Sequence, residues 1–388
     1  MIALVTSFVV AVLALFLPNS TPFSRLWRPS FLFGAFSTFG LSVTYFQYTF
    51  EGLHPAATNL YAAGTVSFFL ADLASTTLLR PAEIAREPRQ FSLENVVRNV
   101  PTIYIYAGLG AIGALVALYL YRQRASMFNM FELGSALRYA EVSRLPTYGA
   151  PYFLLFAQAL GSLFVLNPQR LVRMAGLGIY IVLLLSTFIS LSRTTGIFIL
   201  SSLTFLYYVR SGNFRSLVLP IVAIVALTFG FAYLRGQEGT QESFFFSYAG
   251  YAIYAFNYFI LSLGNFDYGL NSFGSLAKIF AWGLTPEDLS VNGTEYNVYT
   301  FLGAPYRDFG LIGVLTIPFL FGLIWSFVWN RVNMRPIYLF MYSWMIFPCI
   351  IPFFDWKFNL TTYIYLIPIY VILLRPQLRS APSSSVAP

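Results

Sequence analysis

Long apolar runs recur along almost the whole chain and are separated by short polar connections. A helix that spans a bilayer needs about 20 mostly apolar residues. Eleven runs approach that length, and we expect each to be a transmembrane helix: residues 2–17, 30–50, 59–79, 102–121, 150–166, 172–191, 194–209, 216–234, 309–330, 336–353 and 358–374. The first and the fifth are short for a span. The pattern therefore predicts an all-α polytopic membrane protein with about 11 transmembrane helices.

The longest interval between these runs, residues 235–308, contains one further apolar stretch at 244–263. It is long enough to span, but a twelfth helix would invert everything that follows and move Arg331 and Arg335 outside. We therefore predict an interfacial or re-entrant helix there. Tyrosines recur at helical spacing on one arc of it: Tyr248, Tyr251, Tyr254 and Tyr258. Two interpretations of this stripe are open, an aromatic belt at the lipid headgroups and a surface on which sugar rings stack.

The composition supports a membrane location. Of the 388 residues, 57% are hydrophobic and only 10% are charged, and the mean hydropathy is +0.67, which lies far outside the range of soluble domains. A net charge of +8 can point to a nucleic-acid partner, but the basic residues lie in short loops between apolar runs rather than on one face. We expect one transmembrane catalytic domain over residues 1–379 and a disordered cytoplasmic tail over residues 380–388.

Lysine and arginine in short loops predict the orientation, because the cytoplasmic side of a membrane protein carries an excess of both. Arginine-rich connections alternate with poorer ones, which places the N-terminus outside. The inner connections contain Arg25 and Arg28; Arg80, Arg86, Arg89 and Arg98; Arg170 and Arg173; Arg210 and Arg215; Arg331 and Arg335; and Arg375 and Arg379. The loops 122–149 and 235–308 then face outward, and we expect them to carry short amphipathic helices.

The outer side still carries many basic residues, which is unusual for that face and indicates an anionic partner there. Four arginines stand at informative positions: Arg138 in an amphipathic segment of the 122–149 loop, Arg193 between two adjoining runs, Arg235 directly after a run, and Arg307 shortly before one. Each either snorkels to lipid phosphates or binds a phosphate ligand bidentately. We favour the ligand for the first three and retain Arg307 as a candidate. For Arg122 and Arg124 we accept headgroup contact.

Residues 297–313 (NVYTFLGAPYRDFGLIG) close the outer interval and lead into the run that begins near Phe309. Several polar and aromatic side chains stand at the start of this predicted membrane helix, where each polar group needs a hydrogen-bond partner, water or a ligand. We therefore expect the rim of a site. The candidates for positioning or deprotonating a hydroxyl group are Glu141, Glu295, Tyr299 and Asp308. Spacing alone does not identify the base, and a local salt bridge or a solvated loop charge is the alternative for each carboxylate.

Few other residues carry recognisable chemistry. Asp72 lies inside the third run, where it is either a functional intramembrane carboxylate or a buried structural partner for an arginine. The single His54 and the single Cys349 provide neither a metal cluster nor a disulfide framework. The outer loops contain no D-x-D, and H-E-x-x-H, G-x-S-x-G and P-loop patterns are absent. We therefore expect no metal and no other cofactor.

The many-helix layout, the SRT at Arg193, the LRG at Arg235 and the stretch 297–313 together resemble the oligosaccharide repeat-unit polymerases, the Wzy-type O-antigen polymerases of bacterial inner membranes. The resemblance covers most of the chain. It implies a GT-C-like glycosyltransferase that polymerises undecaprenyl-pyrophosphate-linked oligosaccharide repeat units into O-antigen or a related surface polysaccharide at the periplasmic face. Its partners would be the lipid-linked donor and acceptor, membrane lipids and a chain-length-regulating co-polymerase, and no nucleic acid.

The same resemblance implies that Arg138, Arg193 and Arg235 bind the pyrophosphate. Fixed cations aimed at a departing lipid pyrophosphate stabilise its growing negative charge without a metal. O-antigen ligases resemble this layout too, but they are expected to carry a functional histidine in the large outer loop, which has none here. A transporter or flippase of lipid-linked glycans is a further alternative. It predicts internal repeats and polar residues deep in many helices, whereas we find no convincing repeat and, apart from Asp72, nearly charge-free interiors.

Overall fold

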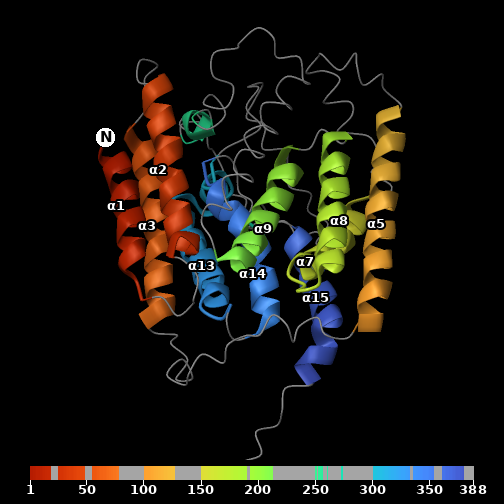
Figure 1. Ribbon diagram of the computed structural model, residues 1–388. Coiled ribbons are helices and arrows are strands. Elements are labelled where there is room, and N and C mark those ends of the chain that lie inside the picture. Colours follow the sequence, from red (N-terminus) through yellow and green to blue (C-terminus); the bar gives the residue numbers. More distant parts are fainter. Residues whose placement is uncertain are drawn as a thin grey trace, which may run out of the picture. The chain divides into compact units, whose positions relative to one another are not determined.

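The computed structural model describes residues 1–18, 25–48, 55–77, 100–126, 150–189, 193–212, 250, 252–256, 260, 272–273, 300–332, 335–353 and 361–379. Within these ranges the chain is helical and has no strand, which confirms the all-α prediction. The helices are α1 (Ile2–Phe16), the 3₁₀ helix η1 (Arg25–Trp27), α2 (Pro29–Tyr48), α3 (Pro55–Thr77), α5 (Val100–Ser126), α7 (Ala150–Val165), α8 (Arg170–Ile189), α9 (Arg193–Ser211), α13 (Gly303–Trp329), α14 (Pro336–Ile350) and α15 (Thr361–Arg379), shown in Figure 1.

These helices follow the apolar runs closely. Each predicted run corresponds to one helix, except the run at 216–234, which lies outside the described residues. The largest difference at a helix start is in α13, which begins six residues before the predicted residue 309. The amphipathic helices predicted for the loops 122–149 and 235–308, and the disordered tail 380–388, lie almost wholly outside the described residues.

Two of the described helices are long and apolar enough to cross a membrane on their own: Arg170–Thr187 within α8, and α13. Shorter apolar helical stretches occur at Ile2–Phe16, Gly108–Leu120, Tyr152–Val165, Pro336–Ile350 and Ile364–Leu374. The length and hydropathy of α8 and α13 are consistent with a membrane protein.

The chain divides into two compact units. Unit 1 contains Met1–Glu87, Thr240–Val332 and Met345–Thr361, and unit 2 contains Pro88–Gly239, Asn333–Trp344 and Thr362–Pro388. In unit 1, α1, α2 and α3 pack against one another, and α13 packs along α3 (Figure 1). Glycines allow close helix contacts there. A Cβ atom on Gly34 would lie 3.0 Å from the backbone nitrogen of Ala11, and one on Gly322 would lie 2.8 Å from the carbonyl oxygen of Phe68.

Unit 2 is built around α5, α7, α8 and α9, with the first part of α14 and α15. Its interior contains a chain of buried hydroxyl groups. The Ser162 and Tyr180 hydroxyls lie 2.8 Å apart, and Ser202 donates to Ser343 over 3.2 Å. Interhelical hydrogen bonds of this kind hold helices together where apolar surroundings offer no competing water. These contacts join α7 to α8 and α9 to α14.

Candidate functional site

The stretch expected to form a rim contains a sharp break in α13. Gly310 has φ 59° and ψ −138°, so the helix is interrupted between Phe309 and Leu311. This conformation is essentially restricted to glycine, because a Cβ atom clashes with the backbone there. A second glycine, Gly313, is also required, since its Cβ atom would lie 2.0 Å from the carbonyl oxygen of Pro305. The part of α13 before Gly310 and the part after it are therefore in direct contact.

Contacts with α3 show that the first part of α13 folds back along the second. Leu302 lies against Gly64, with its Cδ2 atom 2.7 Å from the position a Cβ would take, and the Leu315 carbonyl accepts a hydrogen bond from the Ser67 hydroxyl. Gly64 and Ser67 are about 4.5 Å apart along a helix axis, whereas a continuous helix would separate Leu302 and Leu315 by about 20 Å. Residues 303–309 thus form a short fold-back segment. The predicted start near Phe309 matches the second part of α13, and the fold-back was not predicted.

The two residues that precede the fold-back segment are anchored in the apolar interior of unit 1. Phe301 and Leu302 are fully buried. The Phe301 ring packs edge-on against Phe33, at a centroid distance of 4.7 Å, and against Tyr61, at 5.1 Å. The Phe301 N–H donates to the Pro352 carbonyl over 2.9 Å. These contacts hold the segment between α2 and α3, since aromatic pairs of this geometry add to the effect of burial alone.

Asp308 lies near the turn and is tied to Ser272, far before it in the chain. Its side chain is fully buried, and Oδ2 accepts a hydrogen bond from the backbone N–H of Ser272 at 2.6 Å. A charged acceptor makes this bond stronger than a neutral one. The neighbouring Tyr306 packs edge-on against Phe256 at 5.7 Å. Asp308 is therefore placed to hold Ser272 against the beginning of α13.

The structure describes only some of the predicted site residues. Arg307 is half-buried beside Asp308, and Tyr254 is buried within residues 252–256. Arg193 is the first residue of α9 in unit 2, and its side chain lies outside the described residues. The remaining candidates also lie outside them: Arg138, Glu141, Arg235, Tyr248, Tyr251, Glu295 and Tyr299. The structure thus brings Asp308 together with Ser272, and Tyr306 together with Phe256, and sequence reasoning associated neither pair.

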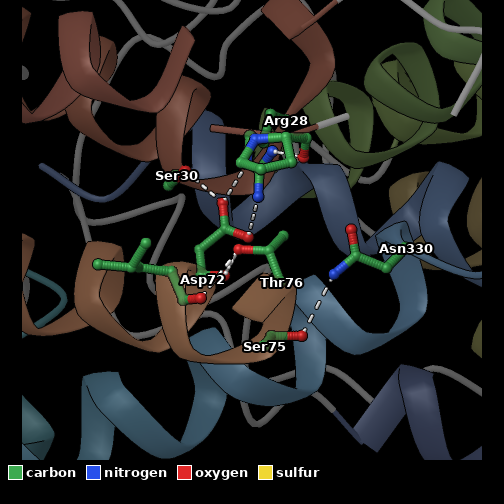
Figure 2. Close-up of polar contacts among 8 residues, drawn as sticks. Arg28, Ser30, Asp72, Ser75, Thr76 and Asn330 are labelled. Atoms are coloured by element: carbon green, nitrogen blue, oxygen red, sulfur yellow. Dashed lines mark hydrogen bonds and ion pairs between the residues drawn. The ribbon is translucent and has the colours of Figure 1, made fainter. Parts of the chain in front are cut away.

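Asp72 is the partner of an arginine, as one of the two sequence interpretations proposed. Arg28 Nε donates to Asp72 Oδ2 at 2.6 Å and one terminal nitrogen donates to Oδ1 at 2.9 Å, while the other donates to the Pro18 carbonyl at 2.8 Å. The Ser30 hydroxyl also donates to Asp72 Oδ2 (Figure 2). Both charged side chains are fully buried. All three guanidinium nitrogens of Arg28 are therefore engaged, and the pair joins the start of α2 to α3.

A second polar contact lies at the same end of unit 1 and is visible in Figure 2. Asn330, which follows α13, donates from its side-chain amide to the Ser75 hydroxyl at 3.3 Å. Thr76 donates to the backbone carbonyl of Asp72 at 2.8 Å. The end of α13 therefore lies beside the last turns of α3, and the turn at Gly310 lies at the opposite end of the helix. The ion pair and the turn are separate features of unit 1.

Among the residues that the structure describes, no group of three or more histidine, cysteine, aspartate or glutamate side chains is placed to hold a metal ion. The described residues of the rim instead offer an arginine, a carboxylate held by a backbone N–H, and aromatic rings. Guanidinium groups and aromatic rings are suited to binding phosphates and sugars. No protein-family model, no curated protein and no solved structure matches the chain.

Proposed function

We propose that the chain is a polytopic enzyme of the bacterial inner membrane that polymerises undecaprenyl-pyrophosphate-linked oligosaccharide repeat units at the periplasmic face. The eleven apolar runs support the membrane location. So do the large apolar side chains that the helices expose, such as Phe8 on α1, Ile312 on α13 and Ile181 on α8. In water such surfaces would associate, whereas lipid chains solvate them.

The observation that carries the proposal is the position of Arg307 and Asp308 at the turn of α13. The opposite end of α13 leads into Arg331 and Arg335, which the distribution of positive charge places in the cytoplasm. The turn then faces the periplasm. It lies at the end of the outer interval, and Tyr306 and Asp308 beside it contact Phe256 and Ser272 of that interval. An arginine and a tethered carboxylate at this level suit chemistry on a lipid-linked anion.

The reaction transfers the growing glycan from its lipid pyrophosphate to a hydroxyl group of the next lipid-linked unit. The glycosidic bond to the pyrophosphate breaks, the pyrophosphate leaves as an anion, and the hydroxyl proton passes to a base. Arg138, Arg193, Arg235 and Arg307 are the proposed cations for the leaving group, and each would contribute about 2–4 kcal/mol of transition-state stabilisation. Asp308 positions the outer segment through Ser272, whereas Glu141, Glu295 and Tyr299 remain candidates for the base.

The test is an in vitro assay with the purified full-length protein in nanodiscs and its undecaprenyl-pyrophosphate repeat unit. Products are resolved as a ladder on a gel, with and without a chelator. We expect a chelator-resistant ladder that Arg193→Ala abolishes. Arg122→Ala is the matched control, since Arg122 is exposed near the end of α5 and should contact only lipid headgroups. A ladder that survives Arg193→Ala at full intensity would contradict the role of that arginine.

A transporter or flippase of the same lipid-linked glycans is the second candidate, and the break in α13 is the observation that favours it. Interrupted helices that fold back at membrane depth are typical of secondary transporters. The same protein in proteoliposomes distinguishes the two functions. Movement of the lipid-linked unit across the bilayer without any lengthening of the glycan would support transport and reject the polymerase.

A further inference from the structure

A groove between α1, α3 and α13 in unit 1 is not used by the proposed reaction. It has a volume of about 530 Å³ and is bordered by Ile2 and Thr6 of α1, Asn59, Ala63 and Leu70 of α3, and Leu315 of α13. This volume is in the range of small-molecule sites. None of the described residues that line the groove is charged. Its occupant is therefore an uncharged part of a molecule.

The groove exists because small side chains face it. Ala62 and Ala63 form part of its wall on α3, where larger residues would fill the space. Ser67 also lines it, but the Ser67 hydroxyl donates to the Leu315 carbonyl, so this polar group is already satisfied by the protein. The deeper part of the groove is consequently apolar. Asn59 and Thr6 supply polar groups nearer the beginning of the two helices.

The surroundings of the groove are apolar as well. Ile2 is 80% exposed, and Leu70 and Leu315 at its border are 46% and 44% exposed. Phe8 on the same helix as Ile2 is 57% exposed. Burial of the apolar part of this surface favours an apolar occupant over water. In a bilayer the molecules that reach it are lipids, so its occupant is a hydrocarbon chain.

The length of the groove indicates which lipid chain fits. Asn59 and Leu70 are eleven residues apart on α3, which corresponds to about 16 Å along the helix axis. One leaflet of the hydrocarbon core is about 15 Å thick, half of roughly 30 Å. The groove therefore matches a chain that crosses one leaflet, with its polar end beside Asn59. A polyisoprenoid chain that is much longer than one leaflet would extend far beyond it.

We propose that this groove binds one acyl chain of a glycerophospholipid from the outer leaflet. The Asn59 amide and the Thr6 hydroxyl hydrogen-bond the ester groups at the glycerol end of the chain, and the chain runs along Ala62 and Ala63 to Leu70. The bound lipid fills the space between α1, α3 and α13. This inference depends on the membrane location proposed above but not on glycosyl transfer.

The test measures lipid retained by the full-length protein after purification in mild detergent from phosphatidylglycerol-supplemented membranes. Native mass spectrometry counts bound phospholipid, and spin-labelled phosphatidylglycerol in nanodiscs reports an immobilised fraction. Ala63→Phe fills the groove without entering the core, because Ala63 is only half-buried. We expect this variant to lose one phospholipid per protein and most of the immobilised fraction. The matched control, Val9→Phe, changes an exposed α1 residue that does not line the groove and should retain both.

A second variant tests the proposal in the case that Ala63→Phe does not fold. Asn59→Ala leaves the groove open and should weaken retention of the phospholipid about tenfold, in line with the loss of one hydrogen bond. Equal phospholipid counts in wild type, Ala63→Phe and Asn59→Ala would overturn the proposal. So would loss of a polyprenyl lipid in place of a phospholipid, or a change of oligomeric state in Ala63→Phe alone. The measured quantity is bound lipid, so this test of the groove does not depend on whether the ladder assay detects polymer.

Discussion

The buried pair between Arg28 and Asp72 allows the sharpest prediction about stability. Asp72→Asn removes the negative charge but keeps the shape of the side chain. Arg28 then remains buried with its charge uncompensated, while the Pro18 carbonyl still accepts from one of its nitrogens. The Ser30 hydroxyl loses a charged acceptor as well. The variant therefore tests the charge of Asp72 rather than its volume.

The expected loss follows from the burial of both partners. Breaking a fully buried ion pair by removing one partner costs about 3–5 kcal/mol, because the other charge stays in a medium that cannot solvate it. That loss corresponds to a roughly 150- to 4,000-fold fall in the equilibrium constant for folding. Arg28→Met alone should cost a similar amount, since it leaves the Asp72 carboxylate buried. The triple variant Arg28→Met, Ser30→Ala, Asp72→Leu leaves no charge behind and should recover all but about 1 kcal/mol.

The assay is reversible unfolding of the purified protein in mixed micelles, with the folded fraction followed over a denaturant titration. Arg25→Ala is the matched control, because Arg25 is exposed and donates to the Leu15 carbonyl rather than to a buried carboxylate. We expect it to lower the free energy of unfolding by less than about 1 kcal/mol. If Asp72→Asn were as stable as the wild type, the pair would not be buried in the folded protein. If the triple variant lost the sum of the single effects, packing rather than charge would account for the loss.

Three further predictions concern the turn of α13 and its anchors. Gly310→Ala should lower the free energy of unfolding by about 1–3 kcal/mol, and Gly313→Ala should prevent the turn from forming. Gly108→Ala is the control, because a Cβ there meets nothing within 4 Å, and it should raise the free energy of unfolding by up to about 1 kcal/mol. Equal unfolding curves for the three variants would contradict the fold-back. Phe301→Ala should cost about 3–5 kcal/mol, measured in the same titration, through the cavity it leaves between α2 and α3. Asp308→Ala should increase proteolytic cleavage near Ser272, because the Ser272 N–H loses its acceptor. Asp308→Asn keeps an acceptor and should restore protection. Unchanged cleavage in Asp308→Ala would show that this hydrogen bond does not protect the chain there.

The sequence was sufficient to locate the helices, because a run of about 20 apolar residues has few alternatives to a helix when its backbone must satisfy its own hydrogen bonds. The prediction was correct for α2, α8 and α9 to within a few residues. It also offered an arginine as one of the two interpretations of Asp72. It could not choose Arg28, since Arg25 stands only three residues away and chain position does not determine which of them turns inward.

The turn of α13 and the setting of Asp308 were decided only by the tertiary structure. The apolar pattern marked where the second part of α13 begins, but it does not reveal that residues 303–309 fold back, because that arrangement is stabilised by packing against α3. Asp308 and Ser272 are 36 residues apart, so their contact depends on how the intervening chain folds. Local composition determines where helices form. Long-range packing determines which buried polar groups meet, since each must find a partner in the folded chain.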